Sequence, residues 1–146
     1  MKALPEQILR VVESTLPRLK VIPAEIARKK PAPDEWSKQE ILGHLIDSAL
    51  NNHQRFVRGG YNAAEAFPPY NQNRWVEIQA YNQRDWHEII DMWALANRHM
   101  CAVLDRLTEE DMKNPCNIGR DAPVSLGFVA EDYLRHMNMH LEQVLV

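Results

Sequence analysis

Four stretches of this sequence place apolar residues three and four positions apart, and this periodicity is the strongest constraint on the fold. The stretches cover residues 4–19, 37–58, 85–107 and 125–145. Residues with this spacing share one face of an α-helix, whereas the alternation that marks a strand is almost absent. Glycine, which weakens helix interiors, occurs only 5 times in 146 residues. The sequence therefore predicts an all-α fold with proline-rich connections between its helices.

Local signals predict where the first two long helices begin and end. Pro17 removes a backbone hydrogen bond and clashes with the preceding turn, so the first helix either kinks there or ends a few residues earlier. Ser37, followed by Glu40 three positions later, forms a capping box, which is the clearest helix start in the chain. The second helix is therefore expected to begin after Ser37 and to end at the glycine pair 59–60.

The rest of the chain contains two more long helices and their connections. Residues 61–84 are expected to form a long crossover with a short helix near residues 73–80, and connections of this length often carry function. In the third helix, Asn97 is the one polar residue of a heptad-spaced apolar seam, where a buried asparagine can fix the register of the helices. A loop over residues 115–123 precedes the fourth helix. A further short turn of helix is predicted at residues 23–28.

Length, charge and apolar runs limit the class of protein. A chain of 146 residues is expected to form a single domain over residues 1–146. Lysine and arginine number 17 against 20 aspartate and glutamate residues, so no basic field favours nucleic acid as a partner. No uncharged run approaches the roughly 20 residues that span a bilayer, and no apolar signal core is present, so we expect a cytoplasmic protein without a membrane segment. Cys101 and Cys116 form no metal or redox motif and are expected to be free thiols.

Histidines are the candidate metal ligands. His136 and His140 are four residues apart, which places them one turn apart on one face of the fourth helix. Such a pair also occurs on ordinary protein surfaces. Here, however, both residues flank the predicted buried face of their helix. A third histidine, His44, lies at the edge of the apolar stripe of the second helix. Three neutral imidazoles from two helices could hold Zn²⁺ or Ni²⁺ and leave positions open for water or substrate. Surface positions are expected for the other histidines, which are His53, His87 and His99.

Two segments of the chain resemble the signatures of a known family. Residues 36–47 read WSKQEILGHLID, and residues 132–143 read DYLRHMNMHLEQ. The first is similar to the Trp-Ser, Glu and His-Leu-x-Asp pattern of the DinB/YfiT-like family, and the second to its closing pair of histidines before Leu and Gln. The resemblance implies an up-down-down-up four-helix bundle that is often a homodimer. It also implies a divalent transition metal ion, zinc or nickel, held by His44, His136 and His140.

The same resemblance implies two kinds of activity on a small-molecule substrate. Members of the family are described as metal-dependent hydrolases or as transferases of low-molecular-weight thiols. Such a thiol would come from outside, because neither cysteine is placed as a nucleophile, and it would need a pocket, which Arg55, Tyr70, Arg74 and Trp75 could frame. Asp47 could orient an imidazole, although a position on the helix surface is the commoner fate of such a carboxylate. The alternative is a non-catalytic metal- or ligand-binding bundle that acts as a dimeric stress or sensing protein.

Overall fold

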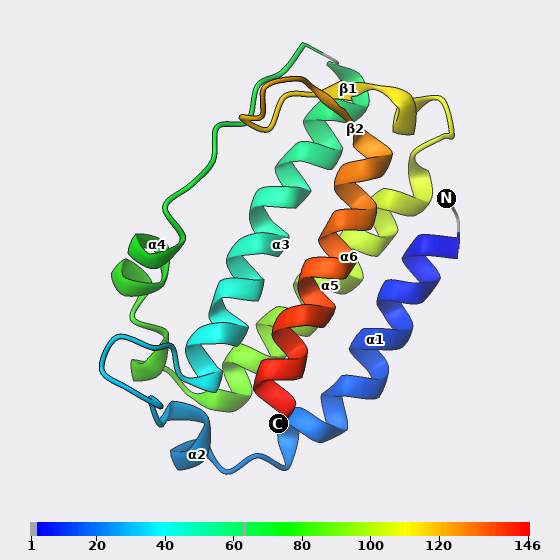
Figure 1. Cartoon of the computed structure of the whole chain (residues 1–146). Helices are drawn as coiled ribbons and strands as arrows, with labels where there is room; N and C mark the ends of the chain where they lie inside the picture. Colours follow the sequence, from blue (N-terminus) through cyan, green and yellow to red (C-terminus); the bar gives the residue numbers. More distant parts are fainter. Residues whose placement is uncertain (1–2, 63) are drawn as a thin grey trace.

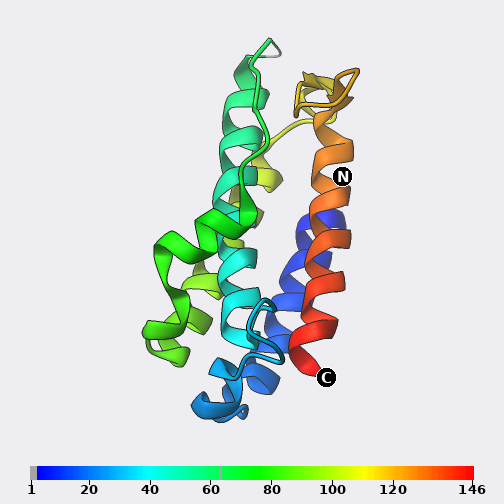
Figure 2. The same cartoon turned by 60° about the vertical axis from the view of Figure 1, so that its left-hand side comes forward.

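The computed structural model describes residues 3–62 and 64–146, and within them four long helices pack side by side (Figure 1 and Figure 2). These helices are α1 (Ala3–Lys20), α3 (Lys38–Tyr61), α5 (Trp86–Arg106) and α6 (Leu126–Leu145). In Figure 1, α1 and α6 run in one direction and α3 and α5 in the other, which confirms the predicted all-α, up-down-down-up four-helix bundle. α3 has its most extensive contacts with α5 and α6, while α1 packs mainly on α5.

Shorter elements connect the four long helices. α2 (Ala24–Arg28) follows α1, which confirms the helical turn predicted at residues 23–28. α4 (Gln72–Gln79) and the 3-10 turn η1 (Tyr81–Gln83) lie in the crossover and pack beside α3, so the short helix predicted near residues 73–80 is also confirmed. The connection from α5 to α6 contains the 3-10 turn η2 (Asp111–Lys113) and a pair of two-residue antiparallel strands, β1 (Pro115–Cys116) and β2 (Val124–Ser125).

α1 continues through Pro17 to Lys20, which matches the helix predicted over residues 4–19 and excludes the alternative that it ends before the proline. A proline in a helix interior costs about 3 kcal/mol, because one hydrogen bond is lost and the ring crowds the preceding turn. The last turn of α1 buries Leu16 and Leu19 in the core, and burying a leucine side chain stabilises by about 1.5–3 kcal/mol. The two leucines therefore offset the effect of Pro17, whose own ring is exposed.

The capping box at the start of α3 is confirmed. The Ser37 Oγ accepts from the Glu40 backbone N–H at 3.0 Å, and the Glu40 carboxylate accepts from the Ser37 backbone N–H at 3.0 Å. At the other end, α3 passes through Gly59 and Gly60 to Tyr61, so the predicted stop at the glycine pair is wrong. Added Cβ atoms at these glycines would lie 3.1 Å from Leu126 and 2.9 Å from Leu107, which shows that both glycines allow close packing at the end of the helix.

Asn97 and Tyr133 form a polar pair in the core of the bundle. Asn97 is fully buried on α5, where its Nδ2 donates to the Trp93 carbonyl at 2.9 Å. The Tyr133 hydroxyl of α6 donates to the Asn97 Oδ1 at 2.5 Å. The asparagine therefore links two helices at a single position, which supports the predicted role in helix register. Large side chains that are completely buried fill the space around this pair, among them Ile8, Leu42, Ile46, Phe56, Trp86, Ile90 and Trp93.

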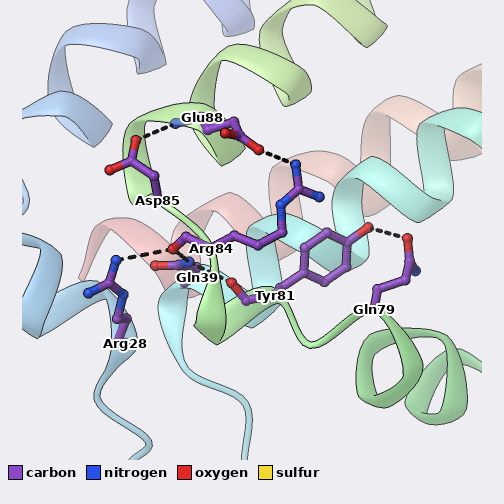
Figure 3. Close-up of polar contacts among 7 residues, drawn as sticks. All are labelled: Arg28, Gln39, Gln79, Tyr81, Arg84, Asp85 and Glu88. Atoms are coloured by element: carbon purple, nitrogen blue, oxygen red, sulfur yellow. Dashed lines mark hydrogen bonds and ion pairs between the residues drawn. The ribbon is translucent and has the colours of Figure 1, made fainter.

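The crossover is tied to the first turns of α3 by polar contacts (Figure 3). Gln39 is fully buried, and its Nε2 donates to the carbonyls of Tyr81 at 2.6 Å and Arg84 at 2.7 Å. The Arg84 carbonyl also accepts from Arg28 at 3.1 Å, which joins α2 to the same point. The ring of Tyr81 lies against Gly43, where an added Cβ would collide with it. Gly43 is therefore required near the start of α3, because the crossover approaches the helix backbone there.

The structure bears on two further predictions, one about membrane-spanning segments and one about the two cysteines. Across residues 3–62 and 64–146, every helix is too short or too polar to cross a membrane. Cys101 and Cys116 are both unbonded and both buried, which confirms that they are free thiols.

Candidate metal centre

His44, His136 and His140 come together between α3 and α6. Each of the three offers a ring nitrogen, and these nitrogens all lie within 4.8 Å of one another. The ring centroids are 5.1 Å apart for His44 and His136, 4.8 Å for His44 and His140, and 4.6 Å for His136 and His140. His44 is completely buried, whereas the two histidines of α6 are half-buried. The arrangement thus has a deep side formed by α3 and an accessible side formed by α6.

The helical pattern explains why these three side chains meet. On α6, the spacing of four residues places His136 and His140 on consecutive turns. Met137 and Leu141 on that helix are buried in the core, so the two neighbouring histidines lie at the edge of the buried face. α3 packs beside α6 in the opposite direction, and its first turns lie next to the last turns of α6 (Figure 1). His44, near the start of α3, therefore faces the pair.

The orientation of the rings fits a metal site. The Nε2 atoms of His44 and His136 are 3.3 Å apart. Two nitrogen ligands at the usual zinc distance and tetrahedral angle lie about 3.3–3.4 Å from each other, so this pair has the spacing of adjacent ligands. The His140 Nδ1 lies 2.9 Å from the Gln143 Oε1. Because that oxygen only accepts, His140 Nδ1 carries the hydrogen and the Nε2 lone pair is left for a metal ion.

The protonation of the histidines favours cation binding. Burial, followed by the charges of His136 and His140, lowers the pKa of His44 to about 3. Burial and the charge of His140 lower the pKa of His136 to about 4. Both imidazoles are therefore neutral near pH 7, and a neutral imidazole is the form that binds a metal ion.

Trp36 covers one side of the centre. Its ring packs on His44 with the centroids 4.9 Å apart and the planes tilted by 37°. Trp36 lies just before the capping residue Ser37, so the start of α3 determines the position of both the tryptophan and His44. An apolar ring here limits the access of water to the histidines from this side.

Asp47 is fully buried, so the expectation of a helix-surface carboxylate is wrong. Its Oδ1 accepts from the Tyr81 hydroxyl at 2.6 Å and from the Gln79 Nε2 at 2.8 Å. Burial raises the pKa of Asp47 above its usual range, although the two hydrogen bonds partly oppose the shift. The reason is tertiary, since the crossover packs over this face of α3. Within the described chain, Asp47 forms hydrogen bonds to the crossover and none to the three histidines.

A pocket of about 180 Å³ opens beside His136. Arg55 and Tyr70 line it, as the sequence predicted, but Arg74 and Trp75 do not. Arg74 forms an ion pair with Glu77 on the surface of α4. Trp75 packs its ring on Tyr70 instead, with centroids 5.0 Å apart. Further lining residues come from α3 and α6, including Ser48, Asn52, Val129, Asp132 and Tyr133.

The other three histidines lie away from this centre. His87 and His99 are exposed, which confirms their expected surface positions. His53 is half-buried and packs against His99 with ring centroids 5.1 Å apart, a proximity that the sequence analysis missed. Burial and the charge of His99 lower the pKa of His53.

The sequence did not predict Gln143 and Trp36 as parts of the metal centre. Gln143 could have been recognised from its position one turn after His140.

Gln143 provides the first testable prediction. We expect Gln143→Ala to weaken zinc binding by about 10–100-fold, because His140 loses the partner that fixes its tautomer. Gln143 is exposed, so the free energy of unfolding of the metal-free protein should change by less than about 0.5 kcal/mol. Competition titration with a chromogenic chelator measures the affinity, and Gln54→Ala, an exposed glutamine on α3, is the matched control. Equal affinity in the parent and Gln143→Ala would show that the hydrogen bond does not orient the ligand.

Comparisons with known proteins agree with this fold. The sequence model of the DinB superfamily matches residues 7–144. The solved structure of YfiT from Bacillus subtilis, described as a probable metal-dependent hydrolase with an unusual four-helix bundle topology, superposes with a TM-score of 0.81 and 19% identity over 96% of this chain and 83% of that chain. A protein of Oceanobacillus iheyensis, named "Putative metal-dependent hydrolase", is 25% identical over 109 residues, or 75% of this chain. The matched region spans 63% of the length of that relative.

Proposed function

This chain belongs to the DinB superfamily, and we propose that it is a metal-dependent hydrolase that acts on a small molecule through His44, His136 and His140. The observation that carries the proposal is the convergence of three imidazoles beside a pocket. Three protein ligands leave at least one position of a divalent ion open, which is typical of catalytic rather than structural zinc sites. The names of the similar proteins support the same class of chemistry.

Each residue of the metal centre has its own role in this proposal. His44, His136 and His140 would hold Zn²⁺ or Ni²⁺, which supplies positive charge that polarises a carbonyl group and acidifies water. Gln143 would keep the His140 Nε2 unprotonated by accepting from its Nδ1. Trp36 would exclude water from the side of His44 on which its ring packs. The substrate would enter from the half-buried side formed by α6.

Two observations favour hydrolysis over thiol transfer: the protonated state of the two cysteines and the small size of the pocket. Burial raises the pKa of Cys101 to about 11 and also raises the pKa of Cys116, so neither is a thiolate near pH 7. A transferred thiol would have to come from outside and occupy space of its own. The pocket volume of about 180 Å³ is below the roughly 300–1,000 Å³ of typical ligand sites, which suits one small substrate better than two.

We expect metal-dependent hydrolysis of small aryl esters or amides by the zinc-loaded protein. Removing the ion with a chelator should lower the rate by at least about a hundredfold, as removal of one electrostatic stabiliser does in other enzymes, and added Zn²⁺ or Ni²⁺ should restore it. Release of the aryl leaving group is followed by absorbance. His140→Ala should remain inactive after metal is added, while His87→Ala, an exposed histidine on α5, should behave as the parent.

Other outcomes identify the alternatives. Metal-dependent conjugation of a small external thiol to an electrophile, without hydrolysis, would assign the transferase reaction instead. A protein that binds the ion but accelerates neither reaction would match a non-catalytic metal-binding bundle with a stress or sensing role. Rates that stay the same after chelation would contradict the role of the three histidines.

A homodimer in the cytoplasm is a further part of the proposal. Leu50, Val57 and Tyr61 expose apolar side chains at spacings of seven and four residues, which places them on one face of α3. A second copy of the chain could cover this face, since exposed apolar stripes often mark contacts between proteins. Light scattering of the purified protein measures the mass, and a monomer at all concentrations would contradict the homodimer.

A further inference from the structure

The guanidinium group of Arg55 lines the pocket beside His136. Arg55 is half-buried there, on the same side of α3 as His44. In the part of the chain that the structure describes, no carboxylate forms an ion pair with Arg55, whereas Arg58 pairs with Glu65 one turn further along. Burial lowers the pKa of Arg55, but a guanidinium still carries its full charge near pH 7. The charge of Asp132 acts on Arg55 from a distance, but a half-buried guanidinium with no ion pair still has donors available for an anion from outside the chain.

The arginine is held in position by its own helix. The Arg55 Nη1 donates to the Asn52 Oδ1 at 3.2 Å. Asn52 is itself buried, and its Nδ2 donates to the Ser48 carbonyl at 2.8 Å and lies 3.3 Å from the Ser48 hydroxyl. All three side chains line the pocket. An arginine fixed in this way loses little side-chain entropy when it binds a ligand, so the site is preorganised.

A hydroxyl group from the crossover faces the same space. Tyr70 lines the pocket, and burial together with the charge of Asp47 raises its pKa to about 12, so its hydroxyl keeps its hydrogen near pH 7. Among the hydrogen bonds of the described residues, none uses this hydroxyl. Trp75 packs on the Tyr70 ring and supports it from outside. The pocket therefore offers a second free donor near the guanidinium.

The hydrogen-bond donors that α3 contributes to the pocket lie on the same face of that helix as His44. Ser48, Asn52 and Arg55 follow His44 at four, eight and eleven residues, so they continue along the same face of α3. On α6, Asp132 lies one turn before His136. α3 and α6 run side by side in opposite directions (Figure 1), and the pocket between them extends from His136 to Arg55. A ligand that has one end at the histidines would bring its other end toward the guanidinium.

The charges and the volume of the pocket limit the ligand. Asp132 also lines it, and its carboxylate is engaged by Arg135 at 2.8 Å. With one guanidinium and one nearby carboxylate, a singly charged anion is favoured over a phosphate dianion, which Asp132 would repel. A planar guanidinium also matches the two oxygens of a carboxylate. The volume of about 180 Å³ is below the range of drug-sized sites, so the ligand is small.

We propose that this pocket binds a small monocarboxylate and that Arg55 is the residue that selects it. The carboxylate accepts from the free side of the Arg55 guanidinium and from the Tyr70 hydroxyl, while the bond to be hydrolysed lies beside His136. This inference rests on the proposed function, because it identifies the pocket's ligand as the substrate of the metal centre. Substrates are thus short acids that carry an ester or amide group near the carboxylate.

The test uses butyrate as the probe and its neutral amide, butyramide, as the matched comparison. Both are titrated into the zinc-loaded protein and into the metal-free protein, because a carboxylate can also ligate zinc directly. The Arg55 Nε–H signal in ¹⁵N-edited NMR spectra reports binding at the guanidinium. We expect butyrate to bind both forms about tenfold or more tighter than butyramide, which corresponds to one charge-assisted contact.

Variants identify the group that recognises the anion. Arg55→Gln should lower the affinity for butyrate about tenfold or more and leave the affinity for butyramide unchanged. Arg98→Gln makes the same change of charge on α5, where the arginine pairs with Glu13, and should bind butyrate as the parent does. Tyr70→Phe should weaken butyrate binding by a smaller factor. If circular dichroism shows that Arg55→Gln is unfolded, the comparison of butyrate with butyramide in the parent protein is the test of the proposal.

The outcomes separate this inference from the proposed function. Equal affinity for butyrate and butyramide, butyrate binding that survives in Arg55→Gln, or tighter binding of inorganic phosphate than of butyrate would each overturn it. Butyrate binding at Arg55 in a protein that takes up no zinc would uphold the anion site and reject the metal-dependent function. Zinc-dependent hydrolysis of neutral esters with no preference for acids would uphold the function and reject the anion site.

Discussion

Replacing His44 by alanine is expected to abolish stoichiometric metal binding. Elemental mass spectrometry should find about one equivalent of a transition metal in the purified parent and essentially none in His44→Ala. His44 is the only ligand candidate that α3 contributes, and its Nε2 lies 3.3 Å from that of His136. Loss of an outer partner weakens metal binding by about 10–100-fold, so the loss of a ligand should exceed this range. The remaining pair on α6 would form a half-buried His-x-x-x-His motif with only two ligands.

Two controls make the metal measurement specific. His99→Ala removes an exposed histidine from α5 and should retain the parent's metal content. Circular dichroism must show that His44→Ala is folded, because His44 is completely buried and its replacement leaves a cavity. If folded His44→Ala keeps one equivalent of metal, the three-histidine site is wrong. If the parent neither retains metal nor takes up added Zn²⁺ or Ni²⁺, the non-catalytic bundle becomes the better hypothesis.

Trp86→Ala is expected to have the largest effect on stability. Trp86 begins α5, its side chain is completely buried, and its Nε1 donates to the Leu19 carbonyl at 3.2 Å. Tryptophan-to-alanine changes in a core lower the free energy of unfolding by about 3–5 kcal/mol. Most small domains have only about 5–15 kcal/mol in total, so the variant should be close to unfolding at 37 °C. Urea denaturation followed by circular dichroism measures the change.

A pair of phenylalanine variants separates the hydrogen bond from the packing. Trp93 lies two turns further along α5 and is also completely buried, but its Nε1 has no partner among the described residues. Trp93→Phe removes an unsatisfied donor, whereas Trp86→Phe removes one of the two hydrogen bonds of the Leu19 carbonyl, which keeps only the bond from the Ile22 backbone N–H at 3.2 Å. We therefore expect Trp86→Phe to be the more destabilising of the two by about 1–2 kcal/mol. Equal losses would show that the Leu19 contact adds nothing beyond packing.

Local patterns were sufficient to predict the helices and the three histidines. The periodicity of apolar residues predicted all four long helices, and the capping box at Ser37 and Glu40 marked the start of α3 correctly. The first helix was predicted over residues 4–19 and spans Ala3–Lys20, whereas α3 passes its predicted end at the glycine pair. α3 continues because its last turn packs against other parts of the bundle, and that stabilisation is invisible in a local window.

The surroundings of the centre required the tertiary structure. Asp47 was expected on the helix surface, because nothing in its own helix indicates that Tyr81 and Gln79, more than thirty residues later, cover it. Arg74 and Trp75 were expected in the pocket with Arg55 and Tyr70, but α4 turns them away. These contacts depend on where the crossover packs, which the spacing of residues within one helix does not specify.

By itself, the sequence determined the helical class, the faces of the helices and the candidate ligands. Each of these follows from interactions within a few residues, where the period of 3.6 residues per turn relates sequence to direction. Only the tertiary structure decided that His44 meets His136 and His140, that Gly43 admits the ring of Tyr81, and that Arg55 lines the pocket beside His136. Those features arise from the packing of α3, α6 and the crossover, because proximity between distant segments depends on how whole surfaces fit together.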